Sequence, residues 1–160
     1  MNTIKIVRIA PDVVMPTKAH DTDAGFDLYA YCPDATFYSW ESGCQSNVKG
    51  VKVRPNETYK FHTGIKLAIP DGYWGGIYAR SGLATKCGLR PANCVGVIDS
   101  CYRGEIIVAI HNDSNETQLI HHGDRIAQLV IQKVEPTVFE EVSELDETSR
   151  GESGFGGSGK

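Results

Sequence analysis

Asp99 and Tyr102 place a carboxylate and an aromatic ring three positions apart within residues 93–104. Glycines and β-branched residues surround them, as expected for a tight turn between short apolar segments. In such a turn both side chains are pinned and can face one pocket, which is the geometry of a binding or catalytic site. Asp and Ser are also routine turn residues, so the alternative is an ordinary hairpin turn capped by Asp99 and Ser100.

Arg80, Ser81 and Gly82 form a second candidate cluster. A guanidinium, a hydroxyl and an unobstructed glycine amide at the start of a short helix offer a phosphate group positive charge and hydrogen-bond donors. The alternative is a strand that ends at an N-capped turn without any ligand. The cluster therefore indicates a phosphate site only where other segments point to the same ligand.

The C-terminal residues 150–160 carry an arginine and an aromatic ring among glycines and serines. Phe155 can stack on a flat ring, an interaction worth roughly 1–3 kcal/mol for a nucleic-acid base. Arg150 can bind a terminal phosphate through charge-assisted hydrogen bonds. The alternative is a solvated tail, because this composition cannot build a core.

Asp27 and Gln128 are further polar positions in strand-like segments. Asp27 can supply a carboxylate to Mg²⁺, which prefers one or two carboxylates together with phosphate oxygens and water; an acidic side chain on an exposed strand face is the alternative. Gln128 is either satisfied within the core or turned toward a ligand. His121 and His122 lack a partner at a standard metal-ligand spacing, so no histidine metal site is expected.

Short β-rich runs separated by turn signals predict an all-β fold, a mostly antiparallel sandwich or barrel. One short helix is expected at residues 81–86, with Ser81 as its N-cap. Residues 31–50 are expected to form an insertion, either a long loop or an extra hairpin. We expect one domain over residues 1–139 and a mobile C-terminal arm over 140–160. The expected strands cover residues 4–9, 25–31, 51–53, 59–69, 73–79, 106–111 and 125–133.

Length, charge and cysteine content narrow the class of protein. A chain of 160 residues suits one domain, and a net charge of −4 with an isoelectric point near 5.7 disfavours general binding to nucleic acid or membranes. No apolar run is long enough to span a membrane or to form a signal peptide. Five cysteines without Cys-x-x-Cys spacing indicate neither a disulfide framework nor a zinc site, so an intracellular, cytoplasmic location is expected, with nuclear or viral origin left open.

Taken in order, five segments resemble the five motifs of the trimeric dUTP pyrophosphatase (dUTPase) family, over about residues 4–160 without the 31–50 insertion. Five motifs in the same order are far more specific than any one alone. Cys101 departs from the family pattern, in which an acidic residue is common at that position. The segments are 24–28 (Ala-Gly-Phe-Asp-Leu), 80–84 (Arg-Ser-Gly-Leu-Ala), 93–104, 123–129 (Gly-Asp-Arg-Ile-Ala-Gln-Leu) and 150–156.

The resemblance implies a distorted β jelly roll assembled as a homotrimer whose active sites are each built from three chains. Arg80 and Gln128 would hold phosphates, the hairpin 93–102 of a neighbouring chain would hold the nucleoside, and the C-terminal arm would close the site. The substrate implied is dUTP, converted to dUMP and pyrophosphate, which lowers dUTP and supplies dUMP for dTMP synthesis.

The implied chemistry assigns a role to each charged residue. Asp99 would orient and deprotonate a water for in-line attack on the α-phosphorus. Mg²⁺, reached through water by Asp27, would bind the triphosphate and neutralise its charge together with Arg80 and Arg150.

The resemblance also implies how the base and sugar are selected. Tyr102 would pack flat against C2′ of the deoxyribose, where a ribose hydroxyl would collide. A close fit to the uracil edge would leave no room for thymine's methyl group, and unpaired polar groups would penalise cytosine. The remaining substrate-binding residues expected are Ser81, Gly82, Asn93, Gly96, Val97, Ile98, Ile107, Phe155 and Gly156.

Two other functions fit parts of the sequence. In the related dCTP deaminase branch a general-base Glu would fall at Ala109, so the chain lacks that base. The other is a non-enzymatic binding or regulatory trimer, for which the aromatic insertion at 31–50 is a candidate protein-binding segment. Asp99, Tyr102, Arg150 and Phe155 favour the enzyme over a purely non-catalytic fold.

Overall fold

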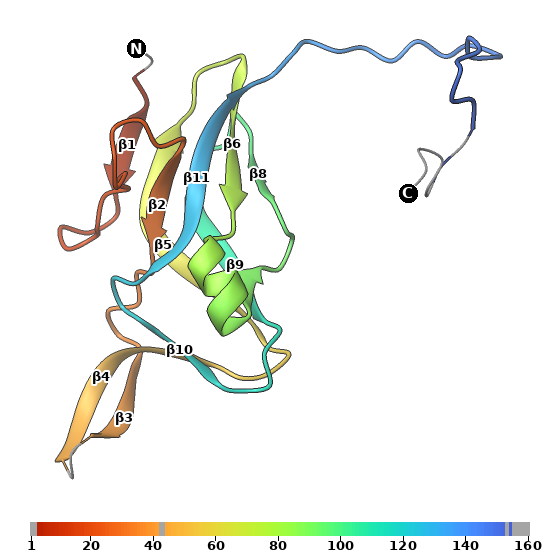
Figure 1. Cartoon of the computed structure of the whole chain (residues 1–160). Helices are drawn as coiled ribbons and strands as arrows, with labels where there is room; N and C mark the ends of the chain where they lie inside the picture. Colours follow the sequence, from red (N-terminus) through yellow and green to blue (C-terminus); the bar gives the residue numbers. More distant parts are fainter. Residues whose placement is uncertain (1–2, 42–43, 153, 155–160) are drawn as a thin grey trace.

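The computed structural model describes residues 3–41, 44–152 and 154, and strands dominate this part of the chain (Figure 1). The one helix in these ranges is a short π-helical segment, η1 (Leu83–Cys87). The prediction of an all-β fold with one short helix is confirmed. The strands are β1 (Lys5–Arg8), β2 (Gly25–Tyr29), β3 (Thr36–Glu41), β4 (Cys44–Val53), β5 (Thr58–Ala68), β6 (Tyr73–Tyr78), β7 (Leu89–Pro91), β8 (Gly96–Ile98), β9 (Glu105–Asn112), β10 (Gln118–His121) and β11 (Arg125–Lys133).

The strands form three antiparallel sheets. Two have four strands, in the orders β1-β5-β9-β7 and β2-β11-β6-β8, and the third has the order β10-β4-β3. Side chains alternate between faces along each strand, so one face can be apolar and the other polar. On β9, for example, Ile106, Val108 and Ile110 are buried while Ile107 is exposed.

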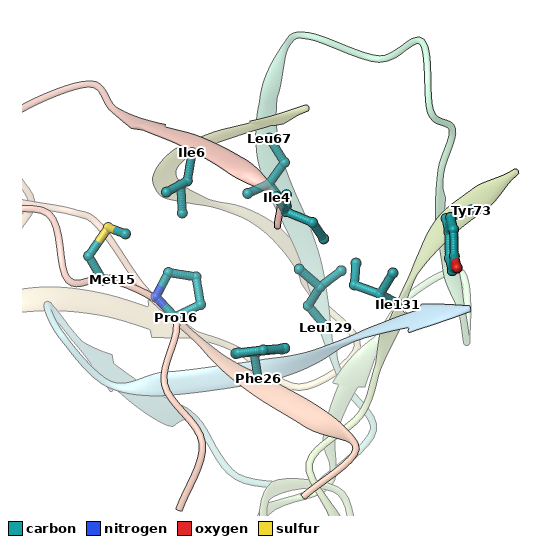
Figure 2. Close-up of a pocket in the computed structure, with 9 residues that line it drawn as sticks. All are labelled: Ile4, Ile6, Met15, Pro16, Phe26, Leu67, Tyr73, Leu129 and Ile131. Atoms are coloured by element: carbon teal, nitrogen blue, oxygen red, sulfur yellow. The ribbon is translucent and has the colours of Figure 1, made fainter. Parts of the chain in front are cut away.

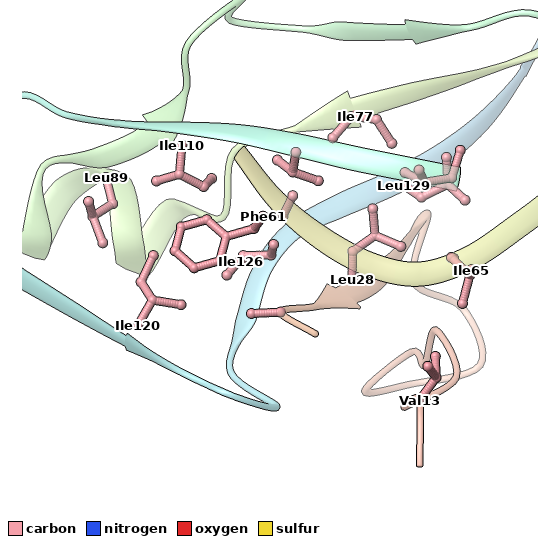
Figure 3. Packing of buried hydrophobic residues seen from close by; sticks show 14 of the residues in the cluster. Val13, Leu28, Phe61, Ile65, Ile77, Leu89, Ile110, Ile120, Ile126 and Leu129 are labelled. Atoms are coloured by element: carbon pink, nitrogen blue, oxygen red, sulfur yellow. The ribbon is translucent and has the colours of Figure 1, made fainter. Parts of the chain in front are cut away.

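The hydrophobic core lies between the two four-stranded sheets (Figure 3). Phe61 and Ile65 of β5 and Ile110 of β9 meet Leu28 of β2 and Ile126 of β11, and each is at most 1% exposed. Burying one such side chain contributes about 1.5–3 kcal/mol before entropy costs. This packing fixes the polar face of the β2-β11-β6-β8 sheet, which carries the predicted phosphate residues.

The insertion at residues 31–50 forms a hairpin, one of the two forms expected. Its strands β3 and β4 pair from Thr36↔Lys49 to Glu41↔Cys44, and the hairpin projects away from the two four-stranded sheets in Figure 1. The inner end of β4 pairs with β10, for example Gly50 with His121. The hairpin is therefore continuous with a strand of the domain.

The expected N-cap of the helix is wrong. Gly82, not Ser81, precedes η1, its backbone is already helical, and no side chain caps the helix. The Thr85 hydroxyl donates a hydrogen bond back to the Ser81 carbonyl at 2.7 Å. The helix ends at Gly88, whose φ of 66° is the left-handed conformation that glycine adopts at little cost.

The segment that follows β11 runs away from the sheets, and every residue from 133 to 152 is exposed (Figure 1). Val138 and Phe139 are more than 90% exposed, although both are apolar. No helix within the described ranges is long and apolar enough to cross a membrane. Free thiols are found at Cys32, Cys87, Cys94 and Cys101.

Candidate active site

Asp27 is a buried carboxylate that holds two arginines. Its Oδ1 accepts a hydrogen bond from Arg80 Nε at 2.9 Å and its Oδ2 accepts one from Arg125 Nη1 at 3.1 Å. The Asp27 side chain is 7% exposed, whereas those of Arg80 and Arg125 are 23% and 49% exposed. The buried charge is therefore paired, and both guanidiniums keep donors within reach of a ligand in solvent.

The strand register places this group in a row across the sheet. Asp27 of β2 lies opposite Gln128 of β11, which in turn lies opposite Tyr78 of β6. Gln128 Nε2 donates to Asp27 Oδ1 at 3.4 Å, and Gln132 Nε2 donates to the Tyr78 hydroxyl at 3.1 Å. Gln128, Tyr78 and Gln132 also line a shallow, open, partly polar hollow.

Arg125 was missed by sequence reasoning because of a bulge. In a regular strand, residues three apart point to opposite faces, which would separate Arg125 from Gln128. The register of β11 against β2 shifts between Arg125 and Ala127, so Arg125 reaches Asp27 on the same side as Gln128. An arginine at the start of a strand was the available signal, but the bulge that redirects it has no sequence signature.

The described residues contain no group of three or more His, Cys, Asp or Glu side chains that could hold a metal ion by themselves. Asp27 is the carboxylate beside the arginine pair, and its Oδ2 accepts one hydrogen bond, from Arg125. A carboxylate oxygen has room for a second donor, such as a metal-bound water. The site thus fits Mg²⁺ only as an ion carried by phosphate oxygens and water, with Asp27 reached through water.

Asp99 and Tyr102 lie on a closed turn, as predicted. The Tyr102 N–H donates to the Asp99 carbonyl at 3.1 Å, and Arg103 Nη1 donates to the Ser100 carbonyl at 2.5 Å. The Asp99 side chain faces solvent and the Tyr102 ring is 43% exposed. Both groups are available to a ligand, while the backbone that carries them is fixed.

The residues expected to read the base lie next to this turn. Gly96 of β8 lies opposite Ile77 of β6, and a Cβ at Gly96 would come within 3.0 Å of Ile77 and 3.5 Å of Asn93 Nδ2. Val97 is 62% exposed and Ile107 is 43% exposed. These side chains present an open, partly apolar surface rather than an enclosed pocket within one chain.

One chain does not bring Asp99 to the arginine pair. Asp99 follows Ile98, which pairs with Gly75 at the start of β6, whereas Arg80 follows the other end of β6. At about 3.3 Å per residue along a strand, the two positions are separated by a distance on the order of 15 Å. The two halves of the predicted site therefore face different parts of the surface.

The C-terminal candidates are only partly described. Arg150 lies in the exposed segment that runs away from the sheets (Figure 1). Phe155 and Gly156 lie outside the described residues. Ser81 and Gly82 are exposed beside Arg80, at the start of the helical segment.

A second hollow has a different chemistry. It is an apolar groove of about 420 Å³ between β1, β2 and β11 (Figure 2). None of the predicted site residues that the structure describes lines it. Its lining residues are Ile4, Ile6, Met15, Pro16, Phe26, Leu67, Tyr73, Leu129 and Ile131.

The fold and the anchored arginine pair define a class: all-β domains suited to a phosphorylated ligand. Comparison with known proteins narrows that class. Residues 45–159 match the dUTPase family. The deoxyuridine 5'-triphosphate nucleotidohydrolase of Mycobacterium leprae is 42% identical over 163 residues, and that of Corynebacterium glutamicum is 45% identical over 158 residues; each alignment covers 98% of this chain and 95% of the relative. The chain belongs to the dUTPase family.

Solved structures agree with this assignment. The dUTPase of Staphylococcus bacteriophage 80alpha, solved with dUpNHpp, has a TM-score of 0.77 and 28% identity over the whole of both chains. An Asp-to-Asn variant of the dUTPase from phage phi11 of Staphylococcus aureus, described as revealing the coordination of a structural Mg(II) ion, has a TM-score of 0.70 at 25% identity, covering 89% of this chain and 98% of that one. The predicted family and fold are confirmed.

Proposed function

We propose that this dUTPase converts dUTP to dUMP and pyrophosphate at a site shared between chains, with Asp99 as the base. The activity itself follows from membership of the family at 42–45% identity over nearly the whole chain. The observation that carries the shared site is the placement of Asp99 near the start of β6 and of Arg80 beyond its end. A triphosphate on the arginine pair then needs the turn of a second chain.

Asp99 acts on water. Its carboxylate lies on a turn closed by the Tyr102 N–H and is exposed, so it can accept a proton from a water positioned beside the α-phosphorus. The water oxygen forms a bond to phosphorus as the bond to the bridging oxygen breaks, and pyrophosphate leaves. Arg80 and Arg125 stabilise the charge on the phosphates, and Asp27 holds both in place.

Mg²⁺, when bound, neutralises part of the triphosphate charge and orders it for in-line attack. This chain would hold the ion through water at Asp27, with phosphate oxygens as its other ligands. The assignment is supported by Asp27 Oδ2, which accepts a hydrogen bond from Arg125 and has room for a second donor such as a metal-bound water.

Selectivity would come from the turn and from β8 and β9. The exposed Tyr102 ring is available to pack against C2′ of the deoxyribose, where a ribose hydroxyl would collide. Asn93 and the backbone around Val97, Ile98 and Ile107 would read the uracil edge. A site whose polar groups are matched to uracil rejects cytosine because those groups would be left unpaired.

A homotrimer is supported by the apolar surface that one chain leaves uncovered. The groove in Figure 2 is lined by apolar residues, and Val7, Ile9, Val138 and Phe139 are exposed apolar side chains that neighbouring chains would cover. A cyclic assembly buries such surface once per interface and generates equivalent shared sites.

Two inactive variants test the shared site. In Asp99→Asn, kcat for dUTP should fall about 10²- to 10⁴-fold, because the amide cannot accept the proton. Binding of a non-hydrolysable dUTP analogue, measured by calorimetry, should be retained. In Arg80→Ala the phosphates lose a guanidinium, and both binding and turnover should fall.

Co-expression of these two variants with different tags distinguishes a shared site from a single-chain site. In each mixed trimer one site in three, or about a third, would combine an intact Arg80 from one chain with an intact Asp99 from its neighbour. Mixed trimers isolated through both tags should therefore recover about a third of wild-type activity. Mixed trimers of the correct mass with no recovered activity would contradict the shared site, and full activity of Asp99→Asn alone would contradict the base.

The β3–β4 hairpin is the candidate segment for a protein partner, because it projects from the domain (Figure 1). Replacing residues 37–48 with a two-residue Asn-Gly turn keeps the Thr36↔Lys49 pair at the base of the hairpin and the β4–β10 pairing. Trimer mass and dUTP turnover should be unchanged in this variant. If every partner interaction also persists, the hairpin has no binding role.

A further inference from the structure

The Tyr102 ring is held in place by the first residue of β9. Its hydroxyl donates a hydrogen bond to the Glu105 carbonyl at 3.0 Å. The hydroxyl also lies so close to Gly104 that a Cβ on Gly104 would collide with it. The position of the ring therefore depends on the position of the Glu105 backbone.

The Glu105 side chain is fixed by two donors on β5. Its Oε1 accepts the Gly64 N–H at 2.8 Å, and its Oε2 lies 2.8 Å from His62 Nδ1. The carboxylate is 15% exposed, while the His62 side chain is 56% exposed. The Glu105 carboxylate is well ordered, because it is mostly buried and each of its oxygens has a partner: the Gly64 N–H at one and the His62 imidazole at the other.

Both donors belong to an irregular stretch of β5 that is itself anchored. Residues 63–65 face only Ile106 on β9, because the register shifts between His62 and Lys66. Gly64 has a φ of 73°, and the buried Thr63 hydroxyl donates to the Ile106 carbonyl at 2.6 Å. The Gly64 carbonyl also accepts the Ile9 N–H at 2.8 Å, so the bulge cannot shift freely.

We propose that the Glu105 carboxylate is a positioning residue for sugar discrimination, because it ties the carbonyl that holds Tyr102 to the β5 bulge. This inference rests on the proposed role of Tyr102 in excluding ribonucleotides. Glu105 touches no reacting group; it fixes where the ring stands. Without the carboxylate, the carbonyl and the ring gain freedom, and a 2′-hydroxyl is tolerated more readily.

The test measures the ratio of kcat/KM for dUTP to kcat/KM for UTP. Glu105→Ala should lower this ratio about fivefold, the size expected for the loss of an ordering hydrogen bond. Glu105→Gln keeps an acceptor for Gly64 and should restore the ratio to near the wild-type value. His62→Ala, at an exposed position, should have a smaller effect in the same direction. A loss of active protein cancels in the ratio, because both substrates are assayed with one preparation.

Asp113→Asn is the matched control. Asp113 follows the other end of β9, and its carboxylate is bound by Arg90 at 2.6 Å. Its substitution removes an ion pair beside the same strand and should leave the ratio unchanged. In a Tyr102→Phe background, which lacks the hydroxyl, Glu105→Ala should produce no further fall, since coupled residues act non-additively.

Tyr102→Ala separates the two claims. If it leaves the dUTP-to-UTP ratio unchanged, Tyr102 is not the sugar filter and the proposed function is wrong on that point. If it collapses the ratio while Glu105→Ala leaves it at the wild-type value, the proposed role of Glu105 alone is overturned.

Discussion

At the residue scale, the buried charge of Asp27 explains how two arginines can be held beside each other. Arg80 and Arg125 would repel one another in isolation, but each donates a hydrogen bond to a different carboxylate oxygen of Asp27. The carboxylate in turn tolerates burial because both of its oxygens are paired with guanidiniums. The chemistry of phosphate binding thus depends on a residue that need not touch the phosphate.

Asp27→Asn should lower the free energy of unfolding by about 2 kcal/mol, since the amide cannot neutralise two guanidiniums. The KM for dUTP should rise as the arginines lose their anchor. Urea unfolding at fixed protein concentration and steady-state kinetics measure the two effects. Asp113→Asn is the control, because that carboxylate is 45% exposed and its pair with Arg90 should contribute less than about 1 kcal/mol. Equal losses in the two variants would contradict the account.

At the element scale, six strands were predicted close to their observed bounds, namely β1, β2, β5, β6, β9 and β11. The ten-residue β4 was predicted as a strand only at 51–53, and the three-residue strands were not predicted. The expected strands at 125–133 and 73–79 correspond closely to β11 and β6, because each is a mostly apolar or aromatic run that follows a turn signal. The strands β7 and β8 have three residues each, and their pairing with β9 and β6 is decided by the tertiary fold. Arg125 and Glu105 were missed for a related reason. The register of β11 shifts beside Arg125, and the register of β5 shifts opposite Glu105. Such bulges leave no clear pattern in the sequence.

The bulge in β5 has a prediction of its own. Gly64→Ala should lower the free energy of unfolding by about 3 kcal/mol, because an alanine would be strained at a φ of 73° and its Cβ would collide with Val13. Gly72→Ala is the matched control: its φ is 78°, but a Cβ there meets nothing within 4 Å. The control should lose about 1 kcal/mol. Thermal or urea unfolding distinguishes the two, and similar losses would mean that the bulge is not closely packed.

At the scale of the whole molecule, one chain carries the parts of a site without assembling them. Arg80 and Asp99 lie near opposite ends of β6, and the segment beyond β11 runs away from the sheets (Figure 1). The resemblance of five ordered motifs predicted these parts, and the proposed trimer would bring them together. The order of the motifs in the sequence therefore indicated the site more clearly than the distances between its parts within one chain.

Removal of residues 150–160 should lower kcat/KM for dUTP about 100-fold, since it deletes the arginine and the aromatic ring proposed to bind phosphate and to stack on the base. The mass of the assembly, measured by light scattering, should stay that of three chains. Removal of residues 158–160 alone retains Arg150 and Phe155 and should leave kcat/KM near the wild-type value. Full activity in the longer deletion would show that the arm takes no part in the site.

Pyrophosphate release from dUTP, UTP, dTTP and dCTP, assayed side by side with the full-length protein, tests the central claim most directly. A site that reads uracil and excludes a 2′-hydroxyl should turn over dUTP with a kcat/KM at least about 100-fold above that for each other nucleotide. Release of ammonia from dCTP should not be observed. Comparable turnover of UTP or dCTP, or no turnover of dUTP, would contradict the assignment.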